Sequence, residues 1–467
     1  MVFSSLTFMF LFLPIVLIIY YVLPKKFKNL LILAASLFFY AWGEPIYVLI
    51  MIASTLVDYF AGLFIHKFQG RRGLQRVALL VSLVMNISLL GVFKYSGFII
   101  DNINGLFGTN IANPNLPLPI GISFFTFQSM SYTIDMYLGK IKVQKNIISF
   151  AAFVTLFPQL VAGPIVRYDD IAAELDNRSV TIDCLYEGIL KFITGVGKKV
   201  LIANNIGMMW TSVKAMDTSE MSVLTAWLGI IAFTFQIYFD FSGYSDMAIG
   251  LGKMMGFNFP ENFNYPYQSK SISEFWRRWH ITLGSWFKSY IYFPLGGSRK
   301  GKGRTIFNLA VVWLVTGIWH GASWNFILWG VMYGVMIILE KLFLGKLLEK
   351  IPWFFQWLYT MLLVVLGWVL FDTADLATAG NYIATMFGAS GIAADNQAWY
   401  LLLNYGNMLV LCFFSSSDAF KRLVEMARKK FPRIVNYGTP LCKITVMFLA
   451  TAYLVDATYN PFLYFNF

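Results

Sequence analysis

The chain has 467 residues, of which 58% are hydrophobic and only 13% are charged. Soluble globular domains carry about 25% charged residues, so this composition excludes an ordinary water-soluble fold. The net charge of +12 comes largely from clusters of Lys and Arg between apolar stretches, which favours cytoplasmic loops of a membrane protein over nucleic-acid binding.

The apolar stretches predict an all-α polytopic membrane protein. Met1–Pro24 is uncharged and lacks a basic start and a clear cleavage site, so it is interpreted as a retained first helix rather than a signal peptide. The later stretches are Asn29–Gly43, Ile46–Ile65, Val77–Phe93, Ile120–Tyr137, Phe150–Ala162, Ser222–Phe239, Ile306–Trp319, Ala322–Leu339, Trp353–Phe371, Trp399–Phe414 and Ile444–Leu454. Because several are short, roughly 11 to 13 membrane helices or re-entrant segments are expected.

The basic clusters also predict an orientation. Counting spans from an outside N-terminus places Lys25–Lys28, His66–Arg76 and Lys140–Lys145 on the cytoplasmic side, as the excess of Lys and Arg in cytoplasmic loops requires. The three cysteines are far apart and predict neither a disulfide framework nor a metal site.

The middle of the chain changes character. From Phe157 to Arg304 it is dense in Gly, Pro, Asn and aromatic residues, which break helices. Irregular backbone at membrane depth survives only inside protein or beside a watery cavity, so we expect the chemistry in this region.

His320 is the first candidate for that chemistry. It lies between the apolar arms Ile306–Trp319 and Ala322–Leu339, and Thr305–Leu339 contains no Asp, Glu, Lys or Arg. Basic loops flank both arms, which predicts a hairpin with His320 at its bend. The first arm is about 14 residues, or about 21 Å, and so too short to cross alone. Gly321, Ala322 and Ser323 are expected to leave room for a substrate, and Trp319 and Trp324 to provide apolar walls. The alternative is a structural histidine at a helix turn.

His280 is the second candidate, in a segment that alternates aromatic and charged residues. A helix would place Arg277 and Trp276 on the same face as His280. Arg277, Arg278, Lys288 and Arg299 are candidates for binding an anionic group such as a phosphate of an acyl carrier. The alternative is an interfacial amphipathic segment with an aromatic belt. The third histidine, His66, has no predicted role.

Asp240 and Asp246 are carboxylates in the apolar run Tyr238–Asp246. Either is able to orient a histidine, but each is equally suited to a structural role or to pairing with Arg277 or Arg278. Asp58 is a further buried-charge candidate with no visible partner. Nucleotide-phosphate loops, zinc-protease signatures and dinucleotide fingerprints are absent, which disfavours hydrolases and phosphate-driven pumps.

A neutral histidine in a dry pocket suits acyl transfer, since it can take a proton from an alcohol whose oxygen then attacks an acyl group. The rival from another class is a proton-coupled or polymer-exporting transporter.

Several long motifs occur in an order that resembles the membrane-bound O-acyltransferase family, most of all its bacterial alginate O-acetyltransferase branch. They are Pro119–Gln128, Pro158–Ile165, Tyr238–Gly250, Pro260–Tyr267, Glu274–His280, Tyr292–Gly297 and Trp319–Ala322. Asp372 departs from the branch, in which we would expect Arg, so the resemblance implies no anion contact at this position.

The resemblance implies one membrane domain over residues 1–467, with N-terminal helices 1–118, a catalytic core 119–340 around a tunnel, and C-terminal helices 341–467. His320 takes the place of the essential histidine, and His280 that of a second characteristic one. Arg277, Arg278, Lys288, Trp319, Asp240 and Asp246 are candidates for binding the donor or the substrate. No cofactor or metal is expected.

The implied reaction moves an acyl group, usually acetyl, from a cytoplasmic donor such as acetyl-CoA toward hydroxyls of an exported polysaccharide or cell-wall polymer. An extracytoplasmic transferase is the implied partner, and the bacterial inner membrane is the implied location. D-alanyl transfer to teichoic acid is the alternative within the family.

Overall fold

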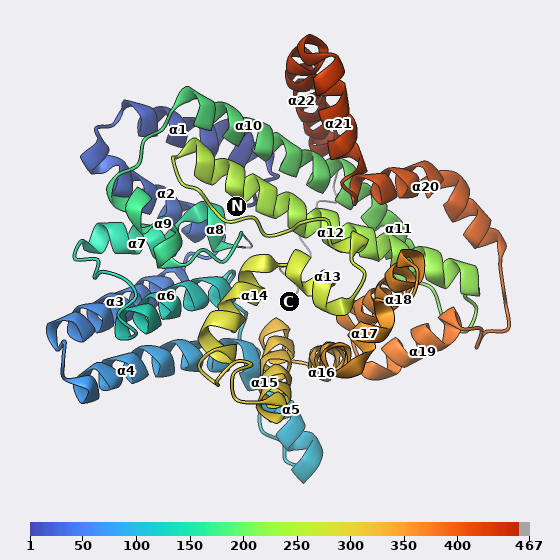
Figure 1. Cartoon of the computed structure of the whole chain (residues 1–467), viewed down its shortest axis with the longest axis horizontal. Helices are drawn as coiled ribbons and strands as arrows, with labels where there is room; N and C mark the ends of the chain where they lie inside the picture. The colour runs from blue at the N-terminus through green and yellow to red at the C-terminus, as the bar shows by residue number, and fades with distance from the viewer. Residues whose placement is uncertain (162, 457–467) are drawn as a thin grey trace. The chain divides into compact units, whose positions relative to one another are not determined.

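The computed structural model describes residues 1–161 and 163–456, and within them the regular secondary structure is entirely helical. Among the described residues, seven helices are long and apolar enough to cross a membrane, and Phe8–Val22 is a shorter apolar helix. The expected all-α polytopic fold is therefore confirmed (Figure 1). The tunnel that the resemblance implies stays a prediction.

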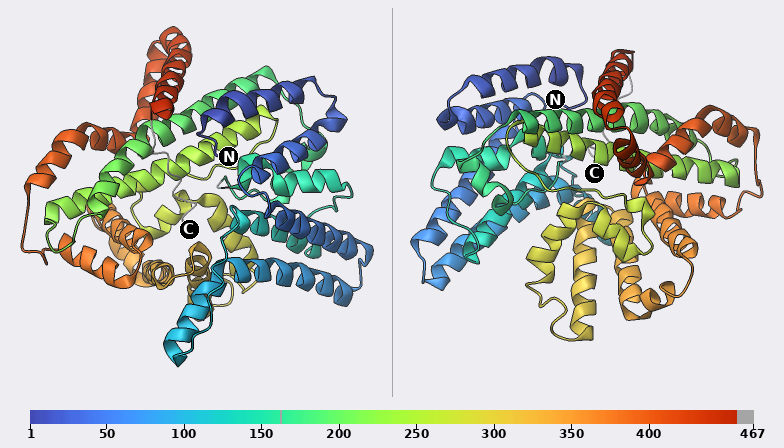
Figure 2. Two further views of the ribbon diagram at one scale, coloured as in Figure 1. Left: turned by 180° about the vertical axis from the view of Figure 1, so that it is seen from behind. Right: turned by 45° about the horizontal axis from the view of Figure 1, so that its top comes forward.

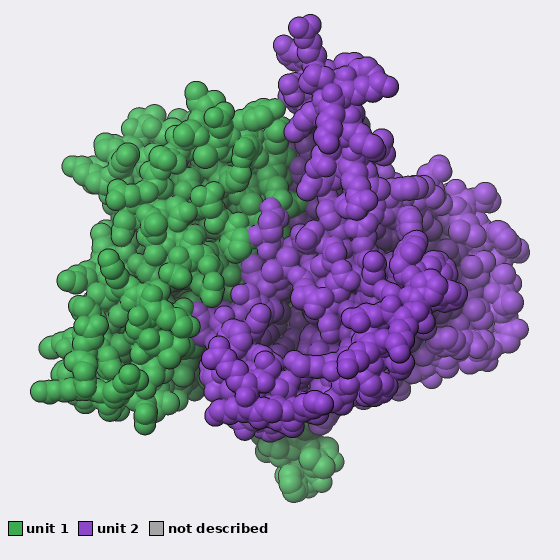
Figure 3. All heavy atoms as spheres, in the orientation of Figure 1, with its two compact units in different colours: residues 1–192, 245–260 green, residues 193–244, 261–467 purple. Residues whose placement is uncertain are grey.

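The described chain forms two compact units, coloured separately in Figure 3. Unit 1 comprises Met1–Phe192 and Ser245–Pro260, and unit 2 comprises Ile193–Tyr244 and Glu261–Phe467. The helices α10 and α12 each cross from one unit into the other, which is why neither unit is continuous in sequence. The predicted division of one domain at residues 118 and 340 stays a prediction.

Unit 1 holds the N-terminal helices. They are α1 (Leu13–Val22), α2 (Lys28–Ala41), α3 (Val48–Lys67), α4 (Arg72–Leu90), α5 (Ser96–Phe107), α6 (Ile122–Tyr137), α7 (Ile147–Thr155), α8 (Phe157–Leu160), α9 (Tyr168–Asp176) and most of α10 (Ile182–Val196). The contacts among α3, α4 and α6 are extensive.

Asp58 lies fully buried among these three helices. Its carboxylate accepts hydrogen bonds from the Ser82 hydroxyl at 2.5 Å and from the Asn86 amide at 2.9 and 3.1 Å. Neutral hydrogen-bond donors on α4 thus satisfy this carboxylate, and no cation among the described residues pairs with it.

Unit 2 holds the remaining helices. They are α11 (Asn204–Lys214), most of α12 (Val223–Met254), α13 (Ile272–Arg278), α14 (Ile281–Phe287), α15 (Lys302–His320), α16 (Trp324–Leu339), α17 (Gly345–Leu348), α18 (Trp353–Asp372), α19 (Leu376–Met386), α20 (Asn396–Ser415), α21 (Ala419–Lys430) and α22 (Pro432–Asp456). Helices α21 and α22 pack on each other and project from this unit (Figure 1).

The predicted hairpin is present as α15 and α16, which lie side by side (Figure 2). Glycines let the two backbones approach closely. A Cβ on Gly317 would lie 2.5 Å from the Phe326 carbonyl oxygen, and one on Gly330 would lie 2.6 Å from the Trp313 carbonyl oxygen. Small residues serve the same purpose in many membrane helix pairs. The packing fixes the bend at residues 321–323, next to His320.

Most predicted segments coincide with helices within a few residues. The segment Val77–Phe93 is part of a longer apolar helix that runs from Arg72 to Phe107, and Ser222–Phe239 is the first half of the 32-residue α12. The segment Phe150–Ala162 is divided between α7 and α8, and its last residue lies outside the described residues.

Candidate active site

His320 is the last residue of α15 and is buried, with 6% of its surface exposed. Three aromatic rings contact its imidazole edge to face. The ring centroids of Trp329, Trp319 and Phe371 lie 4.8, 5.0 and 5.5 Å from that of His320. Because these rings exclude water, His320 occupies the dry setting that its sequence context predicts.

Three details of the predicted hairpin are wrong. The first arm extends from Lys302 to His320, 19 residues or about 28 Å, because the helix continues through Arg304 into the basic loop. Gly321 does not leave room for a substrate, since a Cβ there would lie 2.1 Å from the Phe326 ring, which already fills this space. Trp324 is 56% exposed and is no pocket wall, whereas Trp319 is buried.

The helix expected to carry His280 ends before it. α13 finishes at Arg278, Trp279 is extended, and His280 adopts the left-handed conformation with φ 46° and ψ 54° before α14 begins. The predicted shared face of Arg277, Trp276 and His280 is therefore wrong. Left-handed backbone is uncommon for residues other than glycine. At His280 it points the imidazole in a different direction from the one it would have in a continuous helix.

Asn262 holds the His280 ring, and it is the residue that the sequence reasoning missed. The Asn262 side chain is fully buried, and its Oδ1 lies 3.1 Å from His280 Nδ1. The same oxygen accepts the Thr282 N–H at 3.3 Å and the Thr282 hydroxyl at 2.9 Å. Because the backbone N–H can only donate, Oδ1 is an acceptor and Nδ1 must carry the imidazole proton.

This arrangement leaves Nε2 of His280 as the basic nitrogen. Nε2 is buried and has no hydrogen-bond partner in the part of the chain that the structure describes. Burial lowers the pKa of His280 to about 3, so the ring is neutral at physiological pH. A neutral imidazole with a free lone pair can accept a proton or a hydrogen bond from a bound group.

The imidazole of His280, which carries Nε2, lines a cavity of about 230 Å³. We call this space the apolar cavity. Its other walls come from residues 276–292, which include α14 and the end of α13, and from α15. They include Trp276, Trp279, Leu283, Lys288, Leu309, Val312, Trp313 and Thr316. Lys288 is exposed and is the one Lys or Arg among the residues that line this largely apolar space.

Trp319 connects the two histidines. Its ring centroid lies 6.4 Å from that of His280 and 5.0 Å from that of His320, edge to face with both. The features of the site therefore follow one another along α15. Leu309 and Thr316 line the apolar cavity, Trp319 contacts both imidazoles, and His320 ends the helix about 16 Å from Leu309 at 1.5 Å per residue.

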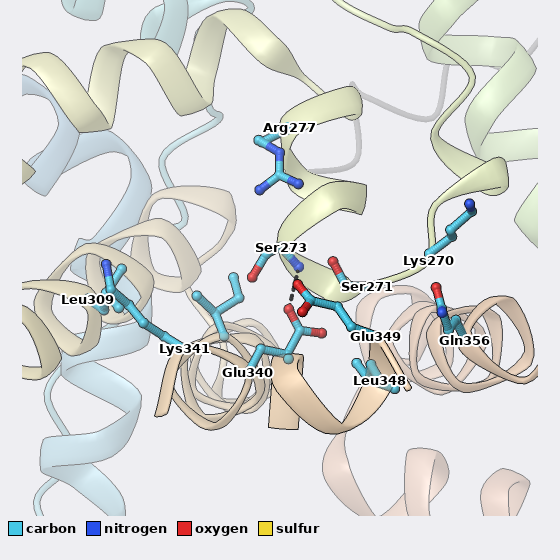
Figure 4. A pocket seen from close by; sticks show the side chains of 12 residues that line it. Lys270, Ser271, Ser273, Arg277, Leu309, Glu340, Lys341, Leu348, Glu349 and Gln356 are labelled. Atoms are coloured by element: carbon cyan, nitrogen blue, oxygen red, sulfur yellow. Dashed lines mark hydrogen bonds between the residues drawn. The ribbon is translucent and has the colours of Figure 1, made fainter. Parts of the chain in front are cut away.

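A second, larger cavity of about 440 Å³, the polar cavity, lies beside the first (Figure 4). The two share Leu309, and successive residues of α13 line them, Trp276 the apolar and Arg277 the polar one. Arg278, by contrast, is engaged in an ion pair with Glu274 at 2.8 Å. Of the predicted donor-binding cations, Arg277 and Lys288 thus face cavities, while Arg278 stabilises α13.

Asp240 and Asp246 each pair with a lysine. Asp240 lies 2.6 Å from Lys199 Nζ with both side chains 3% exposed, and Asp246 lies 3.0 Å from Lys191 Nζ. These ion pairs connect helical segments, which is a structural role, one of the alternatives that the sequence leaves open for Asp240 and Asp246. Asp372 likewise accepts hydrogen bonds from the Trp210 indole at 2.7 Å and from Lys214 at 2.8 Å.

Comparison with known proteins identifies the family of the chain. The model of the membrane-bound O-acyltransferase family matches residues 138–373, which include α13–α16 and both histidines. The chain is 40% identical to the probable alginate O-acetylase AlgI of Pseudomonas putida over all of both chains. It is 31% identical to the peptidoglycan O-acetyltransferase of Helicobacter pylori over all of this chain and 98% of that one. The teichoic acid D-alanyltransferase of Bacillus subtilis is 29% identical over 51% of this chain and 62% of its own.

Proposed function

The chain belongs to the membrane-bound O-acyltransferase family and is a multi-pass membrane acyltransferase, and from this premise we propose that it acetylates an exported polysaccharide. The full-length relative in Pseudomonas putida is named for alginate and the one in Helicobacter pylori for peptidoglycan. Both names describe O-acetylation, whereas the D-alanyltransferase covers only about half of the chain. This difference favours acetyl over D-alanyl transfer.

The observation that carries the mechanism is the enclosed imidazole of His320 at the end of α15. In the proposed reaction its basic nitrogen takes the proton of an acceptor hydroxyl, and the oxygen attacks the carbonyl of an acetyl thioester. The C–S bond breaks as the C–O ester bond forms, and the imidazolium returns the proton to the departing sulfur. Hydroxyl and thioester are thereby converted into ester and thiol without net uptake of protons.

His280 has a different part in this proposal. Its Nε2 faces donor groups that enter the apolar cavity, and its pKa of about 3 keeps it uncharged beside them. It therefore positions the donor through a hydrogen bond, while Trp319 keeps the two imidazoles in one water-excluding cluster. Arg277 and Lys288 are the proposed supports of the donor site, whereas Arg278, Asp240 and Asp246 support it indirectly by stabilising the helices through their ion pairs.

The proposed donor is acetyl-CoA on the cytoplasmic side of the bacterial inner membrane. The basic ends of α15 and α16, residues 299–304 and 341–350, support this side because Lys and Arg concentrate in cytoplasmic loops. The proposed partner is an extracytoplasmic transferase that hands the acetyl group to the polymer. Bacterial relatives support the inner-membrane location.

The test is His320→Ala in the purified protein, with labelled acetyl-CoA as donor and transfer to a soluble polyol as the readout. Loss of a general base lowers the rate by about 10²- to 10⁴-fold, so we expect transfer to fall to near background. His66→Ala removes the remaining histidine, which lies at the end of α3 in unit 1, and we expect it to retain wild-type transfer. Normal transfer by a correctly folded His320→Ala protein would refute the assignment.

A further inference from the structure

Helix α21 carries five cations and one carboxylate in 12 residues. All six of these charged side chains are exposed: Lys421, Arg422, Glu425, Arg428, Lys429 and Lys430. Among the described residues, only Arg422 of this helix forms an ion pair, with Asp418 at 2.7 Å. The other four cations therefore leave a net positive charge on one short helix, and such a charge attracts anions.

The same helix has an apolar stripe that is largely open to its surroundings. The residues of this stripe have the i, i+3, i+4 spacing of one helical face and are Phe420, Leu423, Val424, Ala427 and the C-cap residue Phe431. Phe420, Leu423 and Phe431 are 68%, 61% and 49% exposed. An apolar stripe with Lys and Arg on either side is typical of helices that lie in the interface of a membrane.

The neighbouring helices hold α21 at the surface of the membrane (Figure 1). Helix α20 ends at Ser415 and α22 begins at Pro432, and both are long and apolar enough to cross a bilayer. Helix α21 is about 18 Å long, against about 30 Å of hydrocarbon, so it cannot cross. It connects the two spans on one side, and its excess of Lys and Arg indicates that this side is cytoplasmic. At its start Gln268 Nε2 donates to the Asp418 carboxylate at 3.0 Å, which ties α21 to the segment before α13.

The dipole of the helix accounts for only part of this pattern. Arg428, Lys429 and Lys430 lie in the last turn, where cations stabilise the negative end of the dipole. Lys421 lies in the first turn, where the same dipole disfavours a cation, and the dipole does not explain the exposed apolar stripe. A surface that attracts cations and also accepts apolar side chains explains all of these features.

We propose that α21 binds the anionic phospholipids of the cytoplasmic leaflet. Its cations contact the anionic headgroups, while Phe420, Leu423 and Phe431 enter the boundary between headgroups and acyl chains. The leaflet already lies beside α20 and α22, so this partner does not have to be recruited from solution. The proposal adds a lipid-binding surface to the protein and does not depend on the reaction at His320.

The experiment measures hydrogen exchange of the α21 amides in the purified full-length protein, in nanodiscs of phosphatidylcholine with or without phosphatidylglycerol. Exchange should be about 10-fold slower in the anionic nanodiscs, and high salt should remove most of the difference because it screens exposed charges. Each cation beside an anionic leaflet contributes about 5-fold in affinity, so Lys429→Gln with Lys430→Gln should abolish a difference of this size. Lys346→Gln with Lys350→Gln is the matched control, because both cations are exposed and lie outside α21, and it should keep the full difference.

The exchange of α12 amides in the same samples shows whether each variant is folded. Equal exchange of α21 in both kinds of nanodisc would overturn the proposal and leave an acidic protein as the partner of this surface. A difference that survives in the Lys429→Gln, Lys430→Gln protein, or that the control pair of substitutions also removes, would overturn it as well. Slower exchange of α21 in anionic nanodiscs, lost only in the α21 variant, supports the proposal whether or not the protein transfers acetyl groups.

Discussion

Asn262→Ala is the most informative substitution, because it removes the group that sets the proton position of His280 without touching the ring. The Asn262 oxygen accepts from His280 Nδ1 and from two donors of Thr282. Each net hydrogen bond contributes about 1 kcal/mol, so losing three buried ones lowers the free energy of unfolding by about 3 kcal/mol. Thermal unfolding in detergent measures this loss.

Asn262→Asp separates the proton position from stability. It preserves the acceptor but places a negative charge against His280, which raises the pKa of the imidazole above its native value of about 3. In the native protein the ring is neutral throughout the range of about pH 5 to 9, so the titration of His280 causes no inflection in the pH profile of transfer over that range. In the variant the imidazolium persists to higher pH, Nε2 then carries a proton, and transfer should fall as the pH is lowered.

The assay is kcat/KM for acetyl transfer across that pH range, with the native protein measured in parallel. A variant with native stability and a native pH profile would refute the role given to Nε2 of His280. If Asn262→Asp loses transfer only because it unfolds, its thermal unfolding curve reveals this at every pH. The free energy of unfolding of Asn262→Ala then tests the hydrogen bonds on their own.

Two further predictions concern the supports of the site. Gly321→Ala should lower the free energy of unfolding by about 1 to 3 kcal/mol and reduce transfer, since its Cβ would overlap the Phe326 ring beside His320. Gly303→Ala, in the first turn of α15 with open space around it, should be neutral or slightly stabilising, and equal effects of the two substitutions would contradict the packing argument. Lys199→Met should cost about 3 to 5 kcal/mol by removing the ammonium that pairs with the buried Asp240 carboxylate. The double variant Lys199→Met with Asp240→Leu should regain both stability and transfer, whereas stability without transfer would assign Asp240 to substrate binding.

Helix positions were predictable because a long apolar segment in a membrane must satisfy its own backbone hydrogen bonds, and a helix does this. The hairpin around His320 followed from two such runs between basic loops, and α15 and α16 confirm it. The length of α15 was underestimated because it, too, was predicted from hydropathy. Hydropathy marks where a helix is apolar, whereas Lys302–Thr305 add a polar first turn that hydropathy does not detect.

The break at His280 was not predictable from local sequence. The residues from Glu274 to His280 include no glycine or proline, and their propensities favour continuing α13. The chain leaves the helix because Asn262, 18 residues earlier, binds both the ring of His280 and the first turn of α14. The ion pair of Lys199 with Asp240 is similar, since neighbouring helices bring together two charges that sequence spacing leaves unrelated. Asn262 does lie within Pro260–Tyr267, one of the motifs that resemble the family, and this resemblance is the one sequence feature that indicates its importance.

The backbone of His280 indicates why the site contains two histidines rather than one. A left-handed residue other than glycine costs about 1 to 2 kcal/mol, and Asn262 and Thr282 offset that cost through buried hydrogen bonds. The same contacts fix the proton on Nδ1, so His280 offers one defined lone pair and stays neutral. His320 ends a regular helix without this strain, and its surroundings are aromatic rings. A ring locked in one tautomer suits positioning of a donor, whereas a ring enclosed by aromatic faces suits reversible proton transfer, which supports different parts for the two histidines.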